Sequence, residues 1–163
     1  MKPKIKFKLR RPKKSDLDCY YENRNNIELD RGLFSFTYPY NKKKAVEDLD
    51  KLIRNNEKAN FDVFFIDING ECAGEVGITE IFPKSKGKIH YWLGKKYRGK
   101  GIMTRAVKLI VKYGFKKYKL RRIWGKARKH NKASQKVMEK AGFKLEGVLR
   151  KNVLKRGKYY DDF

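Results

Sequence analysis

A short basic loop rich in glycine separates two apolar segments, and its residue types suit the binding of an anion. The first apolar segment ends at Leu93, and the second, with apolar residues at helical spacing, begins at Ile102. A strand, a loop and a helix in this order leave the backbone N–H groups of the first helical turn without partners. Those N–H groups, the helix dipole and the charges of Arg98 and Lys100 would together bind a pyrophosphate-like anion.

Two phosphate-binding motifs are near matches to this loop. The stretch from Gly94 to Lys100 has the Gly-x-x-x-x-Gly-Lys spacing of a nucleotide P-loop, but Gly101 stands where that motif has the Ser or Thr that holds Mg²⁺. No later apolar strand ends in a lone Asp that could complete a metal site, so we expect no metal. The second motif, Arg-x-x-Gly-x-Gly/Ala, runs from Arg98 to Met103. A basic turn with only a structural role is the alternative for both.

A second segment with polar residues at a helix start follows about 30 residues later. Asn131 and Ser134 stand three residues apart at the beginning of a short helix that we expect from 133 to 141. Gly142 then occupies the position where helices commonly end in a left-handed residue. Asn131 and Ser134 could simply cap this helix. Their place after the glycine loop, with one strand between, favours a shared functional site.

Composition favours one folded domain over residues 1–163. The chain has 163 residues, of which 40% are hydrophobic and 13% aromatic. It contains no run of about 18 apolar residues, so we expect no transmembrane helix and no membrane partner. The first residues alternate charged with apolar side chains, unlike the apolar stretch of a signal peptide. We therefore expect a cytoplasmic protein in which Cys19 and Cys72 are free thiols.

The formal net charge of +25 comes from 43 Lys and Arg residues against 18 Asp and Glu residues. A field of this strength attracts polyanions such as RNA, and it repels cationic molecules such as polyamines. The basic residues are spread along the whole chain, which is also what a general compositional bias would produce. Both explanations of the charge stay open.

The pattern of apolar residues predicts an α/β fold with a single mixed, mostly antiparallel sheet and helices on both faces. We expect strands at 4–10, 62–68, 71–82, 88–93, 121–127, 143–154 and 159–163. We expect helices at 15–23, 41–58, 102–119 and 133–141, and an irregular aromatic segment at 25–40 that includes Phe34 and Phe36. Asn69 and Gly70 predict a tight hairpin, because both residue types tolerate positive φ.

The glycine loop and the second segment together resemble the GNAT superfamily of N-acyltransferases. The Asn-x-x-Ser helix, followed by Gly142-Phe143, Glu146-Gly147 and Leu149-Arg150, is similar to its ribosomal-protein-alanine and spermidine acetyltransferase branch. The resemblance implies the GNAT acyltransferase fold, acetyl-CoA as co-substrate and transfer of an acetyl group to an amine. A protein N-terminal α-amino group, as in a ribosomal protein, is the expected acceptor, and it would attack directly through a tetrahedral intermediate.

The resemblance also assigns residues to the co-substrate. Backbone groups of Trp92 and Leu93 would pair with the pantetheine arm as an added strand does, and N–H groups of the loop would hold the pyrophosphate. Ser134 would lie near the sulfur of CoA and could protonate the departing thiolate. The full expected set for acetyl-CoA is Trp92, Leu93, Arg98, Gly99, Lys100, Gly101, Ile102, Met103, Thr104, Asn131 and Ser134.

The sequence identifies the general base less clearly than it identifies the residues for the co-substrate. An α-amino group, with a pKa of ~7.7–8.0, needs less help from a base than a lysine does. Glu80 and His90 are the candidates, with Glu75 a weaker third. The chain differs from the branch that it resembles at two positions. Lys88 stands where that branch often has Glu, and Met138 stands where many members have a Tyr that acts as general acid.

Two alternatives follow from these departures and from the charge. One is a catalytically weak module of the same fold that binds RNA or the ribosome through its basic surface. The other is an acetyltransferase for small amines, which would need an acidic cleft that the sequence does not show. Either a monomer or a homodimer is compatible with the sequence.

Overall fold

The computed structural model describes residues 5–33 and 38–163. The helices are η1 (Lys14–Asp16), α1 (Leu17–Arg24), α2 (Ile27–Gly32), α3 (Lys42–Asn55), η2 (Lys95–Tyr97), α4 (Ile102–Tyr118) and α5 (Lys132–Lys140). The strands are β1 (Lys8–Arg10), β2 (Phe61–Ile68), β3 (Glu71–Phe82), β4 (Lys86–Leu93), β5 (Arg122–Trp124), β6 (Leu149–Lys155) and β7 (Lys158–Asp162).

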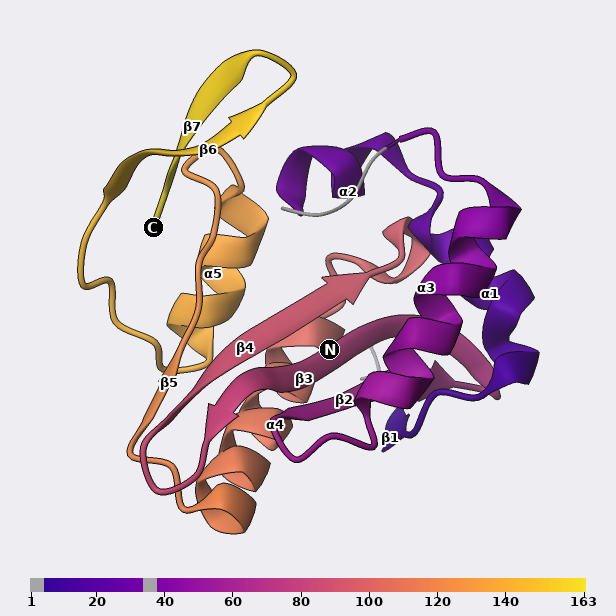
Figure 1. Cartoon of the computed structure of the whole chain (residues 1–163), viewed down its shortest axis with the longest axis horizontal. Coiled ribbons are helices and arrows are strands. Elements are labelled where there is room, and N and C mark those ends of the chain that lie inside the picture. The colour runs from indigo at the N-terminus through magenta and orange to yellow at the C-terminus, as the bar shows by residue number, and fades with distance from the viewer. Residues whose placement is uncertain (1–4, 34–37) are drawn as a thin grey trace.

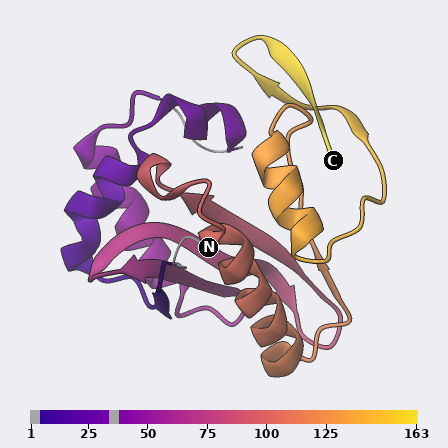
Figure 2. The same cartoon turned by 180° about the vertical axis from the view of Figure 1, so that it is seen from behind.

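Among the described residues, five strands form the central sheet in the order β1-β2-β3-β4-β5. Neighbouring strands are antiparallel except β4 and β5, which are parallel. Helices α1 and α3 cover one face of the sheet, and α4 covers the other (Figure 1, Figure 2). The expected mixed, mostly antiparallel α/β architecture is therefore confirmed.

The alternation of side chains along β4 divides the molecule into two cores. Ile89 and Leu93 pack with residues of α4, such as Met103, on one face. Trp92 packs on the other face with Tyr20 of α1 and with residues of α3. Since neighbouring residues of a strand point to opposite faces, His90 shares the α1 and α3 face, and Tyr91 shares the α4 face.

Two local signals in the sequence act as expected. Asn69 and Gly70 have φ values of 54° and 89°, and they form the tight turn between β2 and β3. The side chain of Asn41 accepts a hydrogen bond of 2.7 Å from the N–H of Lys44, which caps the start of α3.

The segment expected to be irregular contains a helix. Helix α2 has six residues, and the side chain of Asn26 caps it by accepting a hydrogen bond of 2.8 Å from the N–H of Glu28. So short a helix shows too few turns for its periodicity to appear in the sequence. Phe34 and Phe36, which were part of the expected aromatic segment, lie outside the described residues.

The last two strands pair with each other instead of extending the central sheet as regular strands. Strands β6 and β7 form a separate antiparallel pair, which meets the segment after β5 through Ala127 and Phe163. The N–H group of each of these residues donates to the carbonyl of the other, at 2.9 and 2.8 Å. The expected strand from 143 begins only at Leu149, because residues 143–148 have no strand beside them in the described chain.

Candidate active site

Strands β4 and β5 diverge, and this divergence creates the site. Their pairing is limited to Lys86–Lys88 of β4 with Arg122–Trp124 of β5. Beyond that point, the edge of β4 from Ile89 to Leu93 has no strand partner within the described residues, although its other edge pairs with β3. Peptide groups on such a free edge can pair with an extended ligand.

A cavity of about 850 Å³ lies beside this free edge. It is lined by β4, the loop from Arg98 to Thr104, helix α2 and one face of α5. Helix α2 contacts the loop that precedes α5: Nε2 of His130 lies 3.1 Å from the carbonyl oxygen of Arg31. A Cβ atom on Gly32 would come within 2.9 Å of the Asn131 side chain, so a larger residue would disturb this contact. The volume is that of a typical small-molecule site.

The glycine loop presents free N–H groups to the cavity. Gly99 and Gly101 have φ values of +74° and +68°, which non-glycine residues rarely adopt. In the described chain, the N–H groups from Gly99 to Thr104 have no hydrogen-bond acceptor. Helix α4 begins directly after Gly101 without a side-chain cap. The loop therefore has both the free donors and the helix dipole that bind phosphate groups.

The two basic side chains of the loop are held by the protein itself. Nε of Arg98 donates to the carbonyl of Leu93 at 3.0 Å, and its guanidinium also pairs with Glu28 of α2. The backbone N–H of Arg98 donates to Lys95 at 3.2 Å. Nζ of Lys100 donates to the carbonyl of Lys96 at 2.8 Å. The groups of the loop that are available to bind an anion are thus the free amides after Arg98, and not these two side chains.

His90 lines the cavity with a buried carboxylate behind it. Nε2 of His90 lies 2.6 Å from Oε1 of Glu75, whose other oxygen accepts a hydrogen bond of 2.9 Å from Nε1 of Trp92. Glu75 is only 3% exposed. Burial alone would raise the pKa of Glu75, but the charge and hydrogen bond of His90, with the nearby Arg24, hold that pKa below its ordinary value. The carboxylate is thus ionised and orients the imidazole.

Ser134 and Tyr91 form a hydroxyl pair at the α5 side of the cavity. The Oγ atom of Ser134 lies 2.6 Å from the hydroxyl of Tyr91, and both residues line the cavity. Burial raises the pKa of the Tyr91 hydroxyl, so it stays protonated at neutral pH. Asn131 caps α5 by accepting a hydrogen bond of 3.1 Å from the N–H of Ser134.

Glu80 lies away from this arrangement. Its side chain is 51% exposed, is not part of the cavity lining, and pairs with Nζ of Lys88 at 2.6 Å. The structure therefore brings together His90, Ser134, the free loop amides and the edge of β4, and leaves Glu80 outside. Lys100 likewise does not line the cavity.

Two side chains of the site were given little or no role by the sequence analysis. Glu75 ranked below Glu80, and the hydroxyl of Tyr91 was not considered. The register of β3 against β4 could have found Glu75, because it pairs directly with Trp92 and lies two residues from Gly77, the partner of His90, on the same face of β3. The close contact of Tyr91 with Ser134 joins residues 43 positions apart, and no local pattern predicts it.

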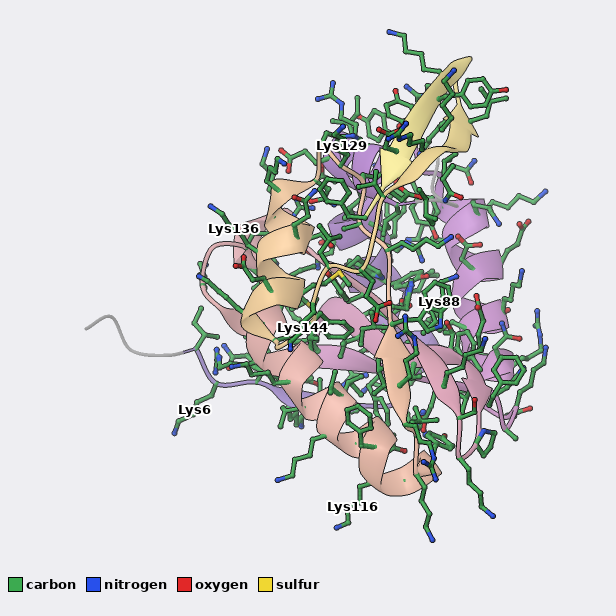
Figure 3. The ribbon with its side chains drawn as sticks, turned by 90° about the vertical axis from the view of Figure 1, so that its left-hand side faces the viewer. Lys6, Lys88, Lys116, Lys129, Lys136 and Lys144 are labelled. Atoms are coloured by element: carbon green, nitrogen blue, oxygen red, sulfur yellow. The ribbon has the colours of Figure 1, made fainter. Side chains whose placement is uncertain are left out.

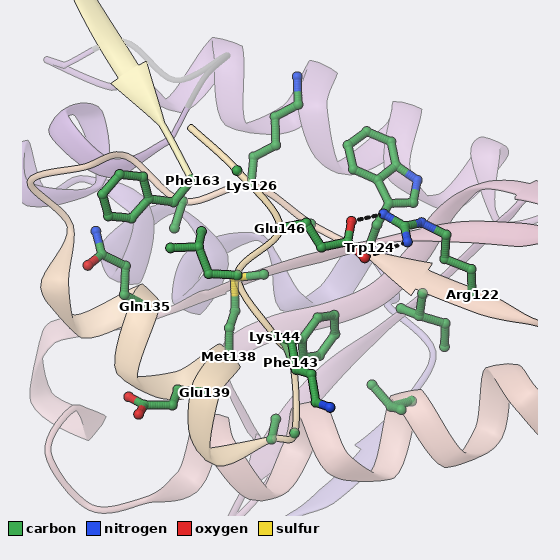
Figure 4. Close-up of a pocket in the computed structure, with 18 of the residues that line it drawn as sticks. Arg122, Trp124, Lys126, Gln135, Met138, Glu139, Phe143, Lys144, Glu146 and Phe163 are labelled. Atoms are coloured by element: carbon green, nitrogen blue, oxygen red, sulfur yellow. Dashed lines mark hydrogen bonds and ion pairs between the residues drawn. The ribbon is translucent and has the colours of Figure 1, made fainter. Parts of the chain in front are cut away.

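A second cavity of about 810 Å³ is lined by β5, by one face of α5 and by residues 141–147 (Figure 4). Met138 and Phe143 line it, and an ion pair between Arg122 and Glu146, at 2.7 Å, lies along its edge. This cavity is separate from the glycine loop and from His90, so the first cavity is the candidate active site. Met138, at the position where the resemblance leads us to expect a tyrosine general acid, lines this second cavity and not the first.

The described residues contain neither a metal-ligand cluster nor a helix that could span a membrane. No group of three or more His, Cys, Asp or Glu side chains is placed to hold a metal ion in that part of the chain. None of the helices in the described residues has the length and apolar composition needed to cross a membrane.

Comparison with known proteins identifies the family. A family model described as an acetyltransferase (GNAT) domain matches residues 6–144. The probable N-acetyltransferase YjcK of Bacillus subtilis is 36% identical over 121 residues, which span 73% of this chain and 66% of that protein. The spermidine N(1)-acetyltransferase of Escherichia coli is 30% identical over 154 residues, spanning 93% of this chain and 80% of that protein.

Two further similarities bear on ligands. The ribosomal-protein-serine acetyltransferase of Escherichia coli is 30% identical over 112 residues, or 66% of this chain and 63% of that protein. The crystal structure of the microcin C7 self-immunity acetyltransferase MccE, in complex with acetyl-CoA and AMP, has a TM-score of 0.84 at 29% identity. It covers 96% of this chain and 88% of that one. The chain belongs to the GNAT acetyltransferases and is an N-acetyltransferase.

Proposed function

We propose that this protein transfers the acetyl group of acetyl-CoA to the α-amino group at the N-terminus of a protein. The observation that carries the proposal is that one cavity combines the free amides after Arg98, the unpaired edge of β4 and the Glu75–His90 pair. The free amides and the strand edge suit a long ligand with phosphate groups at one end. The Glu75–His90 pair suits an amine that must lose a proton.

The residues present fit acetyl-CoA. The N–H groups from Gly99 to Thr104 would hold its pyrophosphate, and the edge of β4 at Trp92 and Leu93 would pair with its pantetheine arm. When bound, acetyl-CoA supplies an activated thioester as the acetyl donor. The presence of acetyl-CoA in the MccE complex supports this assignment.

His90 would accept the proton of the amine. With Nε2 hydrogen-bonded to Glu75, the other ring nitrogen is the one left to act as the base. The buried carboxylate stabilises the imidazolium that forms, as a carboxylate does behind a catalytic histidine. His90 lies on the α1 and α3 face of β4, whereas Ser134 contacts Tyr91 on the α4 face. The proposed base and acid would thus lie on opposite sides of the strand edge.

Ser134 and Tyr91 together would donate a proton to the departing thiolate. The phenol is a much stronger acid than the serine hydroxyl, so Tyr91 is the source of the proton and Ser134 the relay. This pair would take the role of the tyrosine that Met138 replaces. Asn131 would keep Ser134 in position by capping α5.

The charge of the cavity supports a protein N-terminus over a polyamine as acceptor. Among the described residues, Glu28 is the only carboxylate of the lining, and Lys95 and Arg98 already pair with it. A polycation such as spermidine would meet several lysine side chains there. The ribosomal-protein-serine acetyltransferase among the relatives supports the same choice.

A thiol-release assay with acetyl-CoA tests this proposal. The acceptors are a short peptide with a free α-amino group, the same peptide blocked at its N-terminus, and spermidine. We expect turnover only with the free peptide and a loss of about 10²-fold or more in kcat for His90→Gln. Glu57→Gln, an exposed change just after the end of α3 and outside the cavity lining, is the matched control and should keep normal activity. Turnover with spermidine and none with the peptide would contradict the proposal.

A further inference from the structure

We infer that the acceptor end of the cavity binds a carboxylate of the acceptor beside its amine, so that N-terminal segments rich in Asp and Glu are the preferred substrates. This inference rests on the proposed function and adds the class of acceptor. It is carried by a cluster of two ammonium groups and one indole ring at the point where β4 and β5 separate, formed by Lys88, Trp124 and Lys126.

The cluster lies on the same side of β4 as the proposed base. Lys88 precedes His90 by two residues on β4, so both side chains point to the α1 and α3 face. Nζ of Lys88 lies 5.2 Å from the centre of the Trp124 ring, and Nζ of Lys126 lies 5.8 Å from the same centre. Both lysines also line the cavity. The two cations are therefore close to the place where His90 would receive the amine.

One of the two positive charges of the cluster is not balanced by a carboxylate of the protein. Lys88 is balanced, because Glu80 pairs with it at 2.6 Å. Lys126 makes no ion pair with a carboxylate in the described part of the chain, and its side chain is only partly exposed. A partly buried ammonium beside an aromatic ring gains most from an anionic ligand, because water screens it less than it screens a surface lysine.

The spacing suits a peptide with a carboxylate near its N-terminus. Two residues of a strand span about 6.6 Å, which is the distance along β4 from Lys88 to His90. The side chain of Asp or Glu at the first positions of an extended peptide can reach that far from the α-amino group. Arg31 of α2, which lines the opposite wall, adds a further cation along the path of the peptide.

The test compares three octapeptides with the same first residue and a free α-amino group. Residues 2 to 4 of the first peptide are all acidic (Asp or Glu). In the second peptide they are the matching amides (Asn or Gln), and in the third they are all Lys. The wild-type protein should acetylate the acidic peptide with a kcat/KM about tenfold above that of the neutral one, and the basic peptide most slowly. The advantage of the acidic peptide should shrink as salt is added.

A pair of charge-reversed variants separates a local contact from the overall field. Lys126→Glu should abolish the preference for the acidic peptide, while Lys126→Arg should keep it. Lys116→Glu changes the net charge equally, but Lys116 is exposed on α4, away from the cavity (Figure 3), so this variant should keep the preference. Unchanged binding of acetyl-CoA by calorimetry would show that Lys126→Glu is folded.

The outcomes distinguish this inference from the function on which it rests. Equal kcat/KM values for the three peptides in the wild-type protein would overturn the inference and leave the acetyltransferase proposal standing. An equal loss of preference in Lys126→Glu and Lys116→Glu would also overturn it, because the field of the whole protein would then be the cause. No turnover with any peptide, despite bound acetyl-CoA, would overturn both.

Discussion

Oε1 of Glu75 lies 2.6 Å from Nε2 of His90, and the carboxylate has almost no contact with water. A carboxylate is rarely buried without strong partners, because burial disfavours its charge. Glu75 has two, since Trp92 donates to its second oxygen. The pair connects β3 to β4 and leaves the remaining ring nitrogen of His90 without a hydrogen-bond partner in the described residues. We therefore propose His90, and not Glu80, as the base.

Replacing the carboxylate tests whether Glu75 positions His90. We expect Glu75→Gln to lower kcat about tenfold to a hundredfold and to leave the KM for acetyl-CoA unchanged. The KM for the acceptor peptide should also stay unchanged, because Glu75 does not line the cavity and acts only through His90. Steady-state kinetics with each substrate varied in turn measure kcat and both KM values. An unchanged kcat would contradict a positioning role for Glu75.

Removing the phenol tests the proton donor. Tyr91→Phe keeps the ring that packs against the core and removes the hydroxyl that contacts Ser134. We expect kcat to fall about a hundredfold, and Ser134→Ala to have a similar effect, because the two hydroxyls act as one unit. The double variant should then be little slower than either single variant. Met138→Leu, in the second cavity, is the control. Fully additive losses would argue against a shared proton path.

A single methyl group on the glycine loop tests the anion site. Gly101→Ala places a residue with a side chain at φ +68°, which costs about 1–2 kcal/mol, although no other atom lies within 4 Å of the new Cβ. The loop should relax and misalign its N–H groups, so the Kd for acetyl-CoA should rise about tenfold. Gly157→Ala is a matched control, because Gly157 has φ +73° and equally open surroundings in the β6–β7 turn. Equal affinities in calorimetry would contradict the assignment.

The two cysteines should differ sharply in reactivity. A hydrogen bond from the Cys72 thiol lowers the pKa of Cys19 to about 7, helped by the N–H of Cys72 at 3.3 Å. Burial raises the pKa of Cys72. Since the thiolate is the reactive form, alkylation by iodoacetamide should rise with pH and reach half its maximal rate near pH 7. Mass spectrometry should find the label on Cys19 alone. A midpoint near ~8.5 would exclude the hydrogen bond.

Much of the fold was predictable because its signals are local. The hairpin at Asn69 and Gly70, the cap at Asn41 and the glycine loop each depend on residues close together in the sequence. Helix α2 was missed because its six residues are too few to show a helical period. The predicted strand that begins at 143 was too long at its start. A strand needs a paired neighbour, and β7 pairs with this segment only from Leu149 onward.

Only the parts of the site that depend on local sequence were predictable. The free amides after Arg98 follow from glycine at positive φ and from a helix start, which local sequence reveals. The pairing of Glu75 with His90 depends on the register between β3 and β4, and the contact of Tyr91 with Ser134 depends on how α5 packs. The sequence marks residues able to do chemistry, but only the packed structure shows which of them meet.

Hydrogen–deuterium exchange with and without acetyl-CoA shows which backbone amides the co-substrate covers. We propose that it lies along the free edge of β4 and on the amides at the start of α4. Acetyl-CoA should therefore slow the exchange of amides in residues 91–93 and 99–104, and leave the second cavity at 143–149 unchanged. Binding that protects 143–149 instead, or that leaves 99–104 exchanging at the rate of the free protein, would contradict the account.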